Sequence, residues 1–311
     1  MSYFSYGVNK MAACRKKAWR SRYLLLMMFF PFVYLILFEY IPMYGAQIAF
    51  RQFNPFQGIW KSEWVGFYHF KQFFQSVFFF RLFRNTLVIS LIQLAFTFPL
   101  PIIVALMLNE VRNRYVKQSI QTIIYLPHFV SVVVVVGLIF AVLSPYSGII
   151  NSFIKLLGAE PIYFFNEPKY FPFILGLADV WQNTGWGTIV YLAAITAIDP
   201  TLYEAAVVDG AGRYKQMFNI TIPSIMPTII TLFILKMGGL FSVGYQRILL
   251  LYNPTIYETA DVIGTFVYRR GILGQEYSFS SAVGLFNSVL NLIMIVTFNK
   301  IMRRVSETSL W

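Results

Sequence analysis

Long runs of apolar residues alternate with shorter polar segments along the chain. About 20 mostly apolar residues are needed to cross roughly 30 Å of hydrocarbon as a helix. Six runs meet this requirement, residues 23–43, 85–108, 119–143, 171–198, 226–251 and 279–301. The pattern predicts an all-α, polytopic membrane protein with six transmembrane helices. They form one membrane domain, residues 23–304, between an N-terminal segment, residues 1–22, and a tail, residues 305–311.

The first run follows a basic segment, as the apolar core of a signal peptide does. It is long enough to span the membrane, however, and no small-x-small cleavage motif follows it. We therefore expect this run to remain in the protein as a signal anchor.

The segment between the first two runs, residues 44–84, is rich in aromatic residues but is broken by Lys71 and Gln72. This composition suits the membrane interface. It predicts an interfacial amphipathic helix that leads into the second span, either as a simple anchor or as a docking surface. Within the second span, Pro99 and Pro101 predict a kink, because each ring removes a backbone donor.

Composition favours the bilayer over a soluble core. Hydrophobic residues make up 58% of the 311 residues, charged residues 12%, and the mean hydropathy is +0.62. A net charge of +12 would suit a nucleic acid in a soluble protein, but here the aromatic residues lie in apolar runs and not among basic ones. We expect membrane lipid as a partner and no nucleic acid.

Clusters of basic residues predict the orientation of the spans. They precede the first span and follow the second and the sixth: Lys10, Arg15, Lys16, Lys17, Arg20, Arg22, Arg112, Arg114, Lys117, Lys300, Arg303 and Arg304. Such clusters favour the cytoplasmic side. Because the number of spans is even, both termini should be cytoplasmic. Some basic residues, such as Arg247, Arg269 and Arg270, then fall near the outer side.

Several kinds of chemistry are absent from the sequence. Its one cysteine, Cys14, cannot form a disulfide within the chain, and only His69 and His128 accompany it as soft ligands. No G-x-x-x-x-G-K-[ST] phosphate loop occurs, so the chain lacks the backbone nest and lysine that hold ATP phosphates. We expect no catalytic residue, no metal and no cofactor in this chain.

The residues of the loop between the fourth and fifth spans, residues 199–223, predict its local structure. Asp199 is suited to cap a helix that begins at Pro200, and Glu204 lies near the positive end of that helix. Gly210 is suited to end the helix in the left-handed conformation. These features fit an elbow that binds a partner and a plain capped connector equally well.

The same loop resembles the E-A-A-x₃-G-x₉-I-x-L-P signature of permeases in binding-protein-dependent ABC importers, with Ile222 in place of the usual Leu. In that family the loop is a coupling helix that docks in a groove of the ATPase subunit. Small side chains would let that partner approach closely, and the carboxylates could pair across the contact. The resemblance implies an ATPase-coupling role for Glu204, Ala205, Ala206, Asp209, Gly210, Ala211, Ile220 and Pro223.

The resemblance extends over nearly the whole chain, to carbohydrate permeases similar to those of alginate, aldouronate and lipoprotein-type oligosaccharide importers. It is carried by YGAQIAF at residues 44–50, WVGF at 64–67, YLPHF at 125–129, DVW at 179–181 with Gly185, LYNP at 251–254, ADVI at 260–263, YSF at 277–279 and AVGLF at 282–286. Gln246 departs from relatives that commonly have an acidic residue there, which limits any transfer of the sugar's identity.

The resemblance implies a type I ABC importer permease fold in the bacterial inner membrane. One such chain forms half of the pathway for an oligosaccharide. The expected partners are a second, related permease, two ATPase subunits that hold ATP and Mg, and an extracellular sugar-binding protein.

Polar residues inside spans normally face a bundle interior or a cavity, which makes them candidates for a substrate pathway. The candidates are Asp179, Trp181, Gln182, Asn183, Gln246 and Asn287. For each of them a structural role is also open: Asn287 and Asn291 are one helical turn apart and could bond between helices, and Lys236 could pair with Asp179. The sugar could be anionic or neutral.

Two rival functions predict different features. A secondary transporter or channel would need no ATPase, and it would carry inverted repeats and ion-coupling carboxylates deep in the membrane; only Asp179 and Glu39 could serve. A membrane scaffold that retains the permease fold would bind an ATPase without substrate-stimulated hydrolysis.

Overall fold

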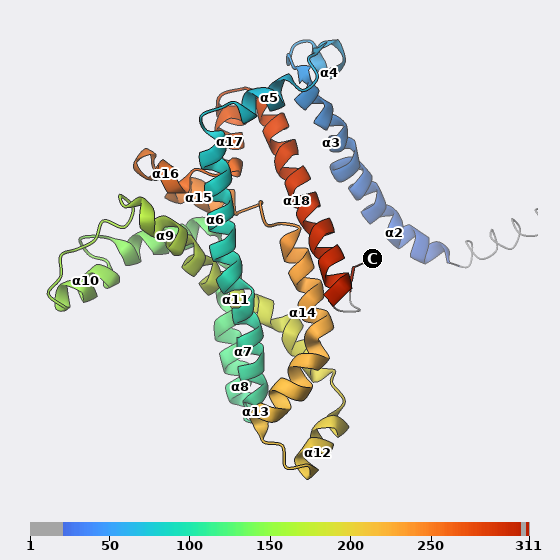
Figure 1. Ribbon diagram of the computed structural model, residues 1–311, viewed down its shortest axis with the longest axis vertical. Coiled ribbons are helices and arrows are strands. Elements are labelled where there is room, and N and C mark those ends of the chain that lie inside the picture. The colour runs from blue at the N-terminus through green and yellow to red at the C-terminus, as the bar shows by residue number, and fades with distance from the viewer. Residues whose placement is uncertain (1–20, 306–308, 311) are drawn as a thin grey trace, which may run out of the picture. The chain divides into compact units, whose positions relative to one another are not determined.

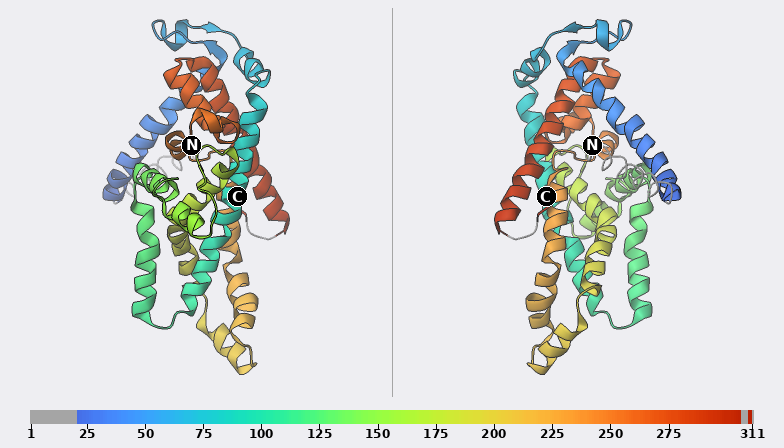
Figure 2. Two further views of the ribbon diagram at one scale, coloured as in Figure 1. Left: turned by 90° about the vertical axis from the view of Figure 1, so that its left-hand side faces the viewer. Right: turned by 90° about the vertical axis from the view of Figure 1, so that its right-hand side faces the viewer.

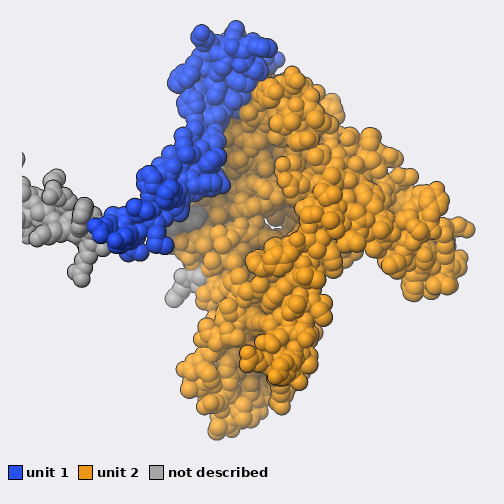
Figure 3. All heavy atoms as spheres, turned by 180° about the vertical axis from the view of Figure 1, so that it is seen from behind, with its two compact units in different colours: residues 1–68 blue, residues 69–311 orange. Residues whose placement is uncertain are grey.

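The computed structural model describes residues 21–305 and 309–310. The chain divides into two compact units, residues 1–68 and 69–311 (Figure 3). Cys14 and most of the basic N-terminal segment lie outside the described residues, as does most of the C-terminal tail.

The described part of unit 1 contains a helical stretch from Arg22 to Phe50. It consists of α2 (Arg22–Leu35), the π-helical turn η1 (Ile36–Tyr40), α3 (Ile41–Met43) and the 3₁₀ helix η2 (Tyr44–Phe50). None of the α2 residues is buried, and apolar side chains cover all of its sides. A helix that is apolar all round suits lipid, in agreement with the first predicted span.

A small β-hairpin follows in unit 1. It pairs β1 (Arg51–Gln52) with β2 (Glu63–Trp64) in antiparallel register, and α4 (Gly58–Lys61) lies in the connection. The guanidinium group of Arg51 lies over the Trp64 ring, 5.4 Å from its centroid.

The segment expected to hold an amphipathic helix that leads into the second span, residues 44–84, is therefore helical only in parts. Only the seven-residue α5 (Tyr68–Phe74) is an α-helix directly before the second span. Two glycines with positive φ, Gly58 at 71° and Gly66 at 58°, turn the chain in the hairpin region and prevent a continuous helix.

Unit 2 is built almost entirely of helices (Figures 1 and 2). In chain order they are α6 (Phe79–Thr97), α7 (Pro99–Glu110), α8 (Arg114–Tyr125), η3 (Leu126–Phe129), α9 (Val132–Leu143), α10 (Ile149–Leu156), η4 (Pro168–Tyr170), α11 (Phe171–Thr196), α12 (Pro200–Val208), α13 (Arg213–Gln216), η5 (Met217–Thr221), α14 (Ile222–Met237), α15 (Tyr245–Leu251), η6 (Pro254–Ile256), α16 (Tyr257–Ala260), α17 (Ile263–Tyr268), η7 (Arg269–Leu273) and α18 (Tyr277–Val305).

Helix α11 is the centre of unit 2, where it packs against α6, α7, α8 and α14. Its contact with α8 depends on Gly185, because a Cβ atom there would lie 1.9 Å from the carbonyl oxygen of Ile124. One apolar core cluster lies along α7, α11 and α14: Ala105, Leu108, Tyr191, Leu192, Ile195 and Ile225.

The second predicted span has a one-residue interruption, and the third is sharply bent. The second is interrupted only at Phe98, between α6 and α7, and Phe79–Glu110 is long and apolar enough to count as one span, so the kink expected from Pro99 and Pro101 stays a prediction. The third bends by 102° between η3 and α9. Pro127 begins η3, and Ser131 caps α9 by accepting a hydrogen bond from the Val134 amide at 3.4 Å, so the turn has its own local cause.

The fifth predicted span, residues 226–251, is also broken. Helix α14 ends at Met237, residues 238–244 are not helical, and α15 starts at Tyr245. Gly238 and Gly239 stand at the break, where glycine destabilises a continuing helix. Among the described residues, four helical stretches are long and apolar enough to cross a membrane as they stand. The number rises to six if two bent pairs of helices, 114–143 and 168–208, each count as one span.

Candidate functional site

Helix α12 is a short capped helix at one end of unit 2 (Figures 1 and 2). Asp199 Oδ1 accepts a hydrogen bond from the Thr201 amide at 3.0 Å, and this bond lowers the pKa of Asp199 below its ordinary value. Gly210 ends the helix with φ at +72°. The local structure expected for this loop is confirmed.

The residues expected to couple to an ATPase lie mainly on the surface of this element. Glu204, Ala205, Asp209 and Gly210 are exposed, and Ala206 and Ala211 are half-buried. Ile220 is half-buried in η5, and Pro223 is exposed in the first turn of α14.

Three contacts fix α12 and the following turn to the rest of unit 2. The hydroxyl groups of Tyr203 and Thr221 lie 2.9 Å apart, and Thr221 is buried at the start of α14. Gln216 donates a hydrogen bond to the carbonyl oxygen of Ala211 at 2.8 Å. On the surface, Arg213 lies 3.6 Å from Glu110 at the end of α7. Such an element can carry a rigid-body displacement into α14.

A cavity of about 850 Å³ lies among α6, α11, α14, α15 and the break between α14 and α15. Its walls include Ser90, Gln93, Asp179, Lys236, Ser242, Tyr245, Gln246, Arg247 and Asn287. A second cavity of about 470 Å³ shares Tyr245, Gly264 and Asn287 with it. Among the described residues, no three His, Cys, Asp or Glu side chains are placed to hold a metal ion.

Part of the cavity wall is irregular backbone, the break at residues 238–244. Side chains from two helices hold this break in place. Ser90 of α6 donates a hydrogen bond to the carbonyl oxygen of Leu240, and Asn291 of α18 accepts one from the Phe241 amide at 2.9 Å. Non-helical backbone within a membrane bundle is tolerated where it lines a cavity.

A polar network borders this cavity. Arg247 of α15 pairs with Asp179 of α11 at 3.3 Å and donates a hydrogen bond to Gln182. Asn183 donates to Asp179 at 2.7 Å, and its Oδ1 atom lies 3.1 Å from Nδ1 of His128. The side chain of Arg247 is only 11% exposed, although the sequence placed it near the outer surface.

The pairing considered between Lys236 and Asp179 is wrong. Asp179 is occupied by Arg247 and Asn183, whereas Lys236 lines the cavity without an ion pair to a described residue. Asn291 has the structural role considered for it, because it accepts a hydrogen bond from the backbone of the break. The Oδ1 atom of Asn287, in contrast, is buried without a partner among the described residues.

Half of the substrate candidates line the main cavity, namely Asp179, Gln246 and Asn287. The other three do not. Trp181 lines a separate cavity of about 210 Å³, because two residues along an α-helix rotate a side chain by about 200° from Asp179. Gln182 is buried and donates a hydrogen bond to the carbonyl oxygen of Val130 at 2.8 Å.

Sequence reasoning missed several wall residues. Gln93 and Ser90 come from α6, and Tyr245 follows the break. Gln93 is a polar residue inside an apolar run, which was a usable signal. Tyr245 offered none, because aromatic residues occur throughout the chain.

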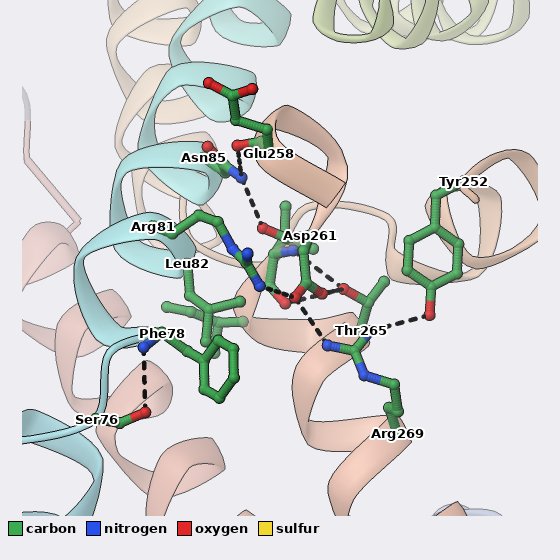
Figure 4. Close-up of polar contacts among 12 residues, drawn as sticks. Ser76, Phe78, Arg81, Leu82, Asn85, Tyr252, Glu258, Asp261, Thr265 and Arg269 are labelled. Atoms are coloured by element: carbon green, nitrogen blue, oxygen red, sulfur yellow. Dashed lines mark hydrogen bonds and ion pairs between the residues drawn. The ribbon is translucent and has the colours of Figure 1, made fainter. Parts of the chain in front are cut away.

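A second polar cluster surrounds Asp261, just before α17 (Figure 4). Its fully buried carboxylate accepts from Arg269 at 2.8 Å and from Arg81 of α6 at 3.3 Å. The hydroxyl group of Thr265 lies 3.0 Å from the other carboxylate oxygen, and Asn85 of α6 donates to the Asp261 carbonyl oxygen at 3.0 Å. This cluster fastens α6 to the segment before α17, and sequence analysis gave it no role.

Comparisons with known proteins agree with this architecture. The family of binding-protein-dependent transport system inner membrane components matches residues 97–307. Protein LplB of Bacillus subtilis (strain 168) is 43% identical, over 98% of this chain and 95% of its own length. The polygalacturonan/rhamnogalacturonan transport system permease protein YteP of the same organism is 44% identical, over 94% of this chain and 91% of its own.

The fold is also found in solved structures. One chain of a bacterial alginate ABC transporter, in complex with an alginate pentasaccharide-bound periplasmic protein, superimposes with a TM-score of 0.86 at 41% identity. The match covers 95% of this chain and 99% of that one. The type I importer permease fold predicted from the sequence is thereby confirmed. The chain belongs to the family of inner membrane components of binding-protein-dependent transport systems, which are transport components and not enzymes.

Proposed function

We propose that this chain forms half of the membrane pathway of an ATP-driven importer that takes up an oligosaccharide. The observation that carries the proposal is α12, a capped and exposed helix held to α14, in the loop that carries the family's E-A-A signature. Relatives that transport polygalacturonan or alginate support a carbohydrate substrate.

In this proposal the chain works with four kinds of partner. A second, related permease completes the pathway, and two ATPase subunits bind ATP and Mg. An extracellular sugar-binding protein delivers the oligosaccharide, and lipid surrounds the spans. Helix α12 faces the cytoplasm, since it must reach the ATPase. Both termini lie on the same side, because the number of spans is even.

ATP-driven closure of the ATPase pair would push α12, and the bond between Tyr203 and Thr221 would pass the displacement to α14. Helix α14 ends at the break that lines the cavity. A displacement of α14 therefore changes the cavity wall, as alternation between two rigid states requires. We place the oligosaccharide in the main cavity, against Gln246 and Asn287. Gln182 and Asn183 hold the Asp179–Arg247 pair in the wall of that cavity, and Trp181 lines the separate cavity on another side of α11.

Two substitutions in α12 test this role. Glu204→Lys reverses the exposed charge offered to the ATPase, and Gly210→Val forces a β-branched residue into a left-handed conformation. Each is expected to lower oligosaccharide uptake by the assembled importer at least about tenfold, corresponding to about 1.4 kcal/mol of coupling. The readouts are uptake into proteoliposomes and co-purification of the ATPase subunit.

Matched variants separate coupling from general damage. Glu160→Lys makes the same charge change on an exposed loop, and Gly210→Asn keeps a residue that tolerates the left-handed conformation. Both should retain uptake. Full uptake together with normal ATPase co-purification by Glu204→Lys and Gly210→Val would rule out the coupling role.

A further inference from the structure

Three charged side chains line the main cavity, Asp179, Lys236 and Arg247. One carboxylate therefore faces two cations, which leaves the wall with a net positive charge. The distribution of that charge follows from how the three groups are bonded.

Asp179 and Arg247 neutralise each other. They are 3.3 Å apart, and their side chains are only 20% and 11% exposed. Gln182 and Asn183 bond to the two members of the pair, so neither side chain is free to rotate toward a ligand. This pair acts as fixed wall structure and not as a charge available to a substrate.

Lys236 is different. It lies in the last turn of α14, is exposed to the cavity, and has no hydrogen bond or ion pair to a described residue. An ionised side chain within a membrane-spanning segment is costly, and such residues usually mark a water-filled pathway or an absent counter-ion. The helix C-terminus favours a cation there but offsets only a small part of that cost.

Neutral polar groups with spare bonding capacity line the same cavity as this lysine. Gln93 and Gln246 line the cavity and make no side-chain hydrogen bond to a described residue, and Asn287 Oδ1 is a buried acceptor without a donor. Tyr245 adds an aromatic ring that is 40% exposed. Amides and an aromatic face suit the hydroxyl groups and the ring of a sugar, and the lysine suits a carboxylate.

We infer that Lys236 is a specificity-determining residue that binds a carboxylate group of an acidic oligosaccharide during its passage. The inference rests on the proposed function and names the chemical class of its substrate. A protein carboxylate, supplied by the second permease, is the competing occupant.

The test uses the complete importer in proteoliposomes and compares Lys236→Gln and Lys236→Arg with the unchanged protein. The probes are oligosaccharides from pectin, alginate and glucuronoxylan, each supplied as the free carboxylate and as its neutral methyl ester. The ratio of the two uptake rates is compared between variants, because the preference of the binding protein is the same in each and cancels.

The unchanged importer should take up at least one of the carboxylates. Lys236→Gln should reduce that uptake about tenfold, change uptake of the methyl ester by less than about twofold, and leave co-purification of the second permease intact. Lys236→Arg should restore most of the carboxylate uptake, since it keeps the charge. Lys155→Gln, the same change on exposed α10, should have no effect.

Five outcomes would overturn the inference. An equal loss of acid and ester uptake, or loss of the second permease, would assign Lys236 to a protein partner. Unchanged acid uptake by Lys236→Gln, or uptake of neutral sugars alone by the unchanged importer, would remove it from substrate recognition and leave the proposed function standing. Hydrolysis of ATP without uptake of any sugar would instead count against the oligosaccharide proposal itself, and the inference would fall with it.

Discussion

At the scale of single residues, the buried carboxylate of Asp261 should be the most sensitive charged group in unit 2. Asp261→Asn leaves Arg81 and Arg269 facing each other without their common counter-ion. Removing one partner of a buried ion pair costs about 3 kcal/mol. We expect a clear fall in the thermal unfolding temperature of the detergent-solubilised importer, measured by intrinsic fluorescence or light scattering.

The ion pair of Arg270 and Glu276 provides the control for that prediction. Its two atoms lie 2.9 Å apart, yet the side chains are 42% and 38% exposed. Glu276→Gln should therefore cost less than about 1 kcal/mol, because water screens the pair. Equal effects of Asp261→Asn and Glu276→Gln would show that burial does not set the strength of the Asp261 cluster.

The sequence alone did not show which charged residues form ion pairs with each other. The sequence offered Lys236 as a partner for Asp179, whereas Arg247 holds that position. The error has a physical cause. Spacing along the chain identifies neighbours within one helix, but a partner on another helix depends on the break after Met237, which changes the course of the chain before Arg247.

At the scale of helices, the contact between α8 and α11 should tolerate no side chain at Gly185. In Gly185→Ala, the new methyl group would lie 1.9 Å from the Ile124 carbonyl oxygen, so one helix must move. Overpacking of this kind costs about 1–3 kcal/mol, and we expect a lower yield of folded permease and a lower unfolding temperature.

Gly137→Ala in α9 is the matched control, since a Cβ atom there would meet nothing within 4 Å. This variant should be neutral or slightly stabilising, because alanine favours helix over glycine by about 1 kcal/mol. If both alanine variants behave alike, close backbone packing is not what Gly185 provides.

Helix existence was easier to predict than helix continuity. Apolar runs identified the spans, and the one-residue interruption at Phe98 lies directly before Pro99. The 102° bend before α9 was missed, because Ser131 and Pro127 lie within a run whose average composition is strongly apolar. Capping and turn geometry act over two or three residues, whereas a span is recognised by an average over about 20.

At the scale of the whole molecule, the proposed orientation can be tested with cysteine labelling, because Cys14 is the only cysteine in the sequence. In a Cys14→Ser background, Phe56→Cys should react with a membrane-impermeant thiol reagent in intact cells. Val208→Cys at the end of α12 should react only after permeabilisation. Within this chain both positions are well exposed, with Phe56 at 99% and Val208 at 87%, so in cells that lack the ATPase subunit access to the reagent is limited by sidedness and not by burial.

Cys14 itself gives an internal check in the unchanged chain, where it should be labelled only after permeabilisation. Labelling of Val208→Cys in intact cells would contradict the orientation and, with it, contact between α12 and a cytoplasmic ATPase.

The family and the fold class could be predicted from features that are recognised without knowing how the helices pack. These are six apolar runs, basic flanks and the spaced signature from Glu204 to Pro223. The cavity could not be derived in this way. Its wall combines Gln93 from α6, Asp179 from α11, Lys236 from α14 and Asn287 from α18, which are far apart in the sequence. Only the packing of these helices decides which of the many polar residues face one space.

The break at residues 238–244 has a consequence for how the cavity can change between related proteins. There the wall is made partly of peptide groups, and substitution of a side chain leaves the peptide group in place. Because Ser90 and Asn291 anchor this backbone from α6 and α18, its position depends on those two residues as well as on its own sequence. New sugar preferences should therefore arise through side chains such as Lys236, Gln246 and Asn287, around a constant backbone surface.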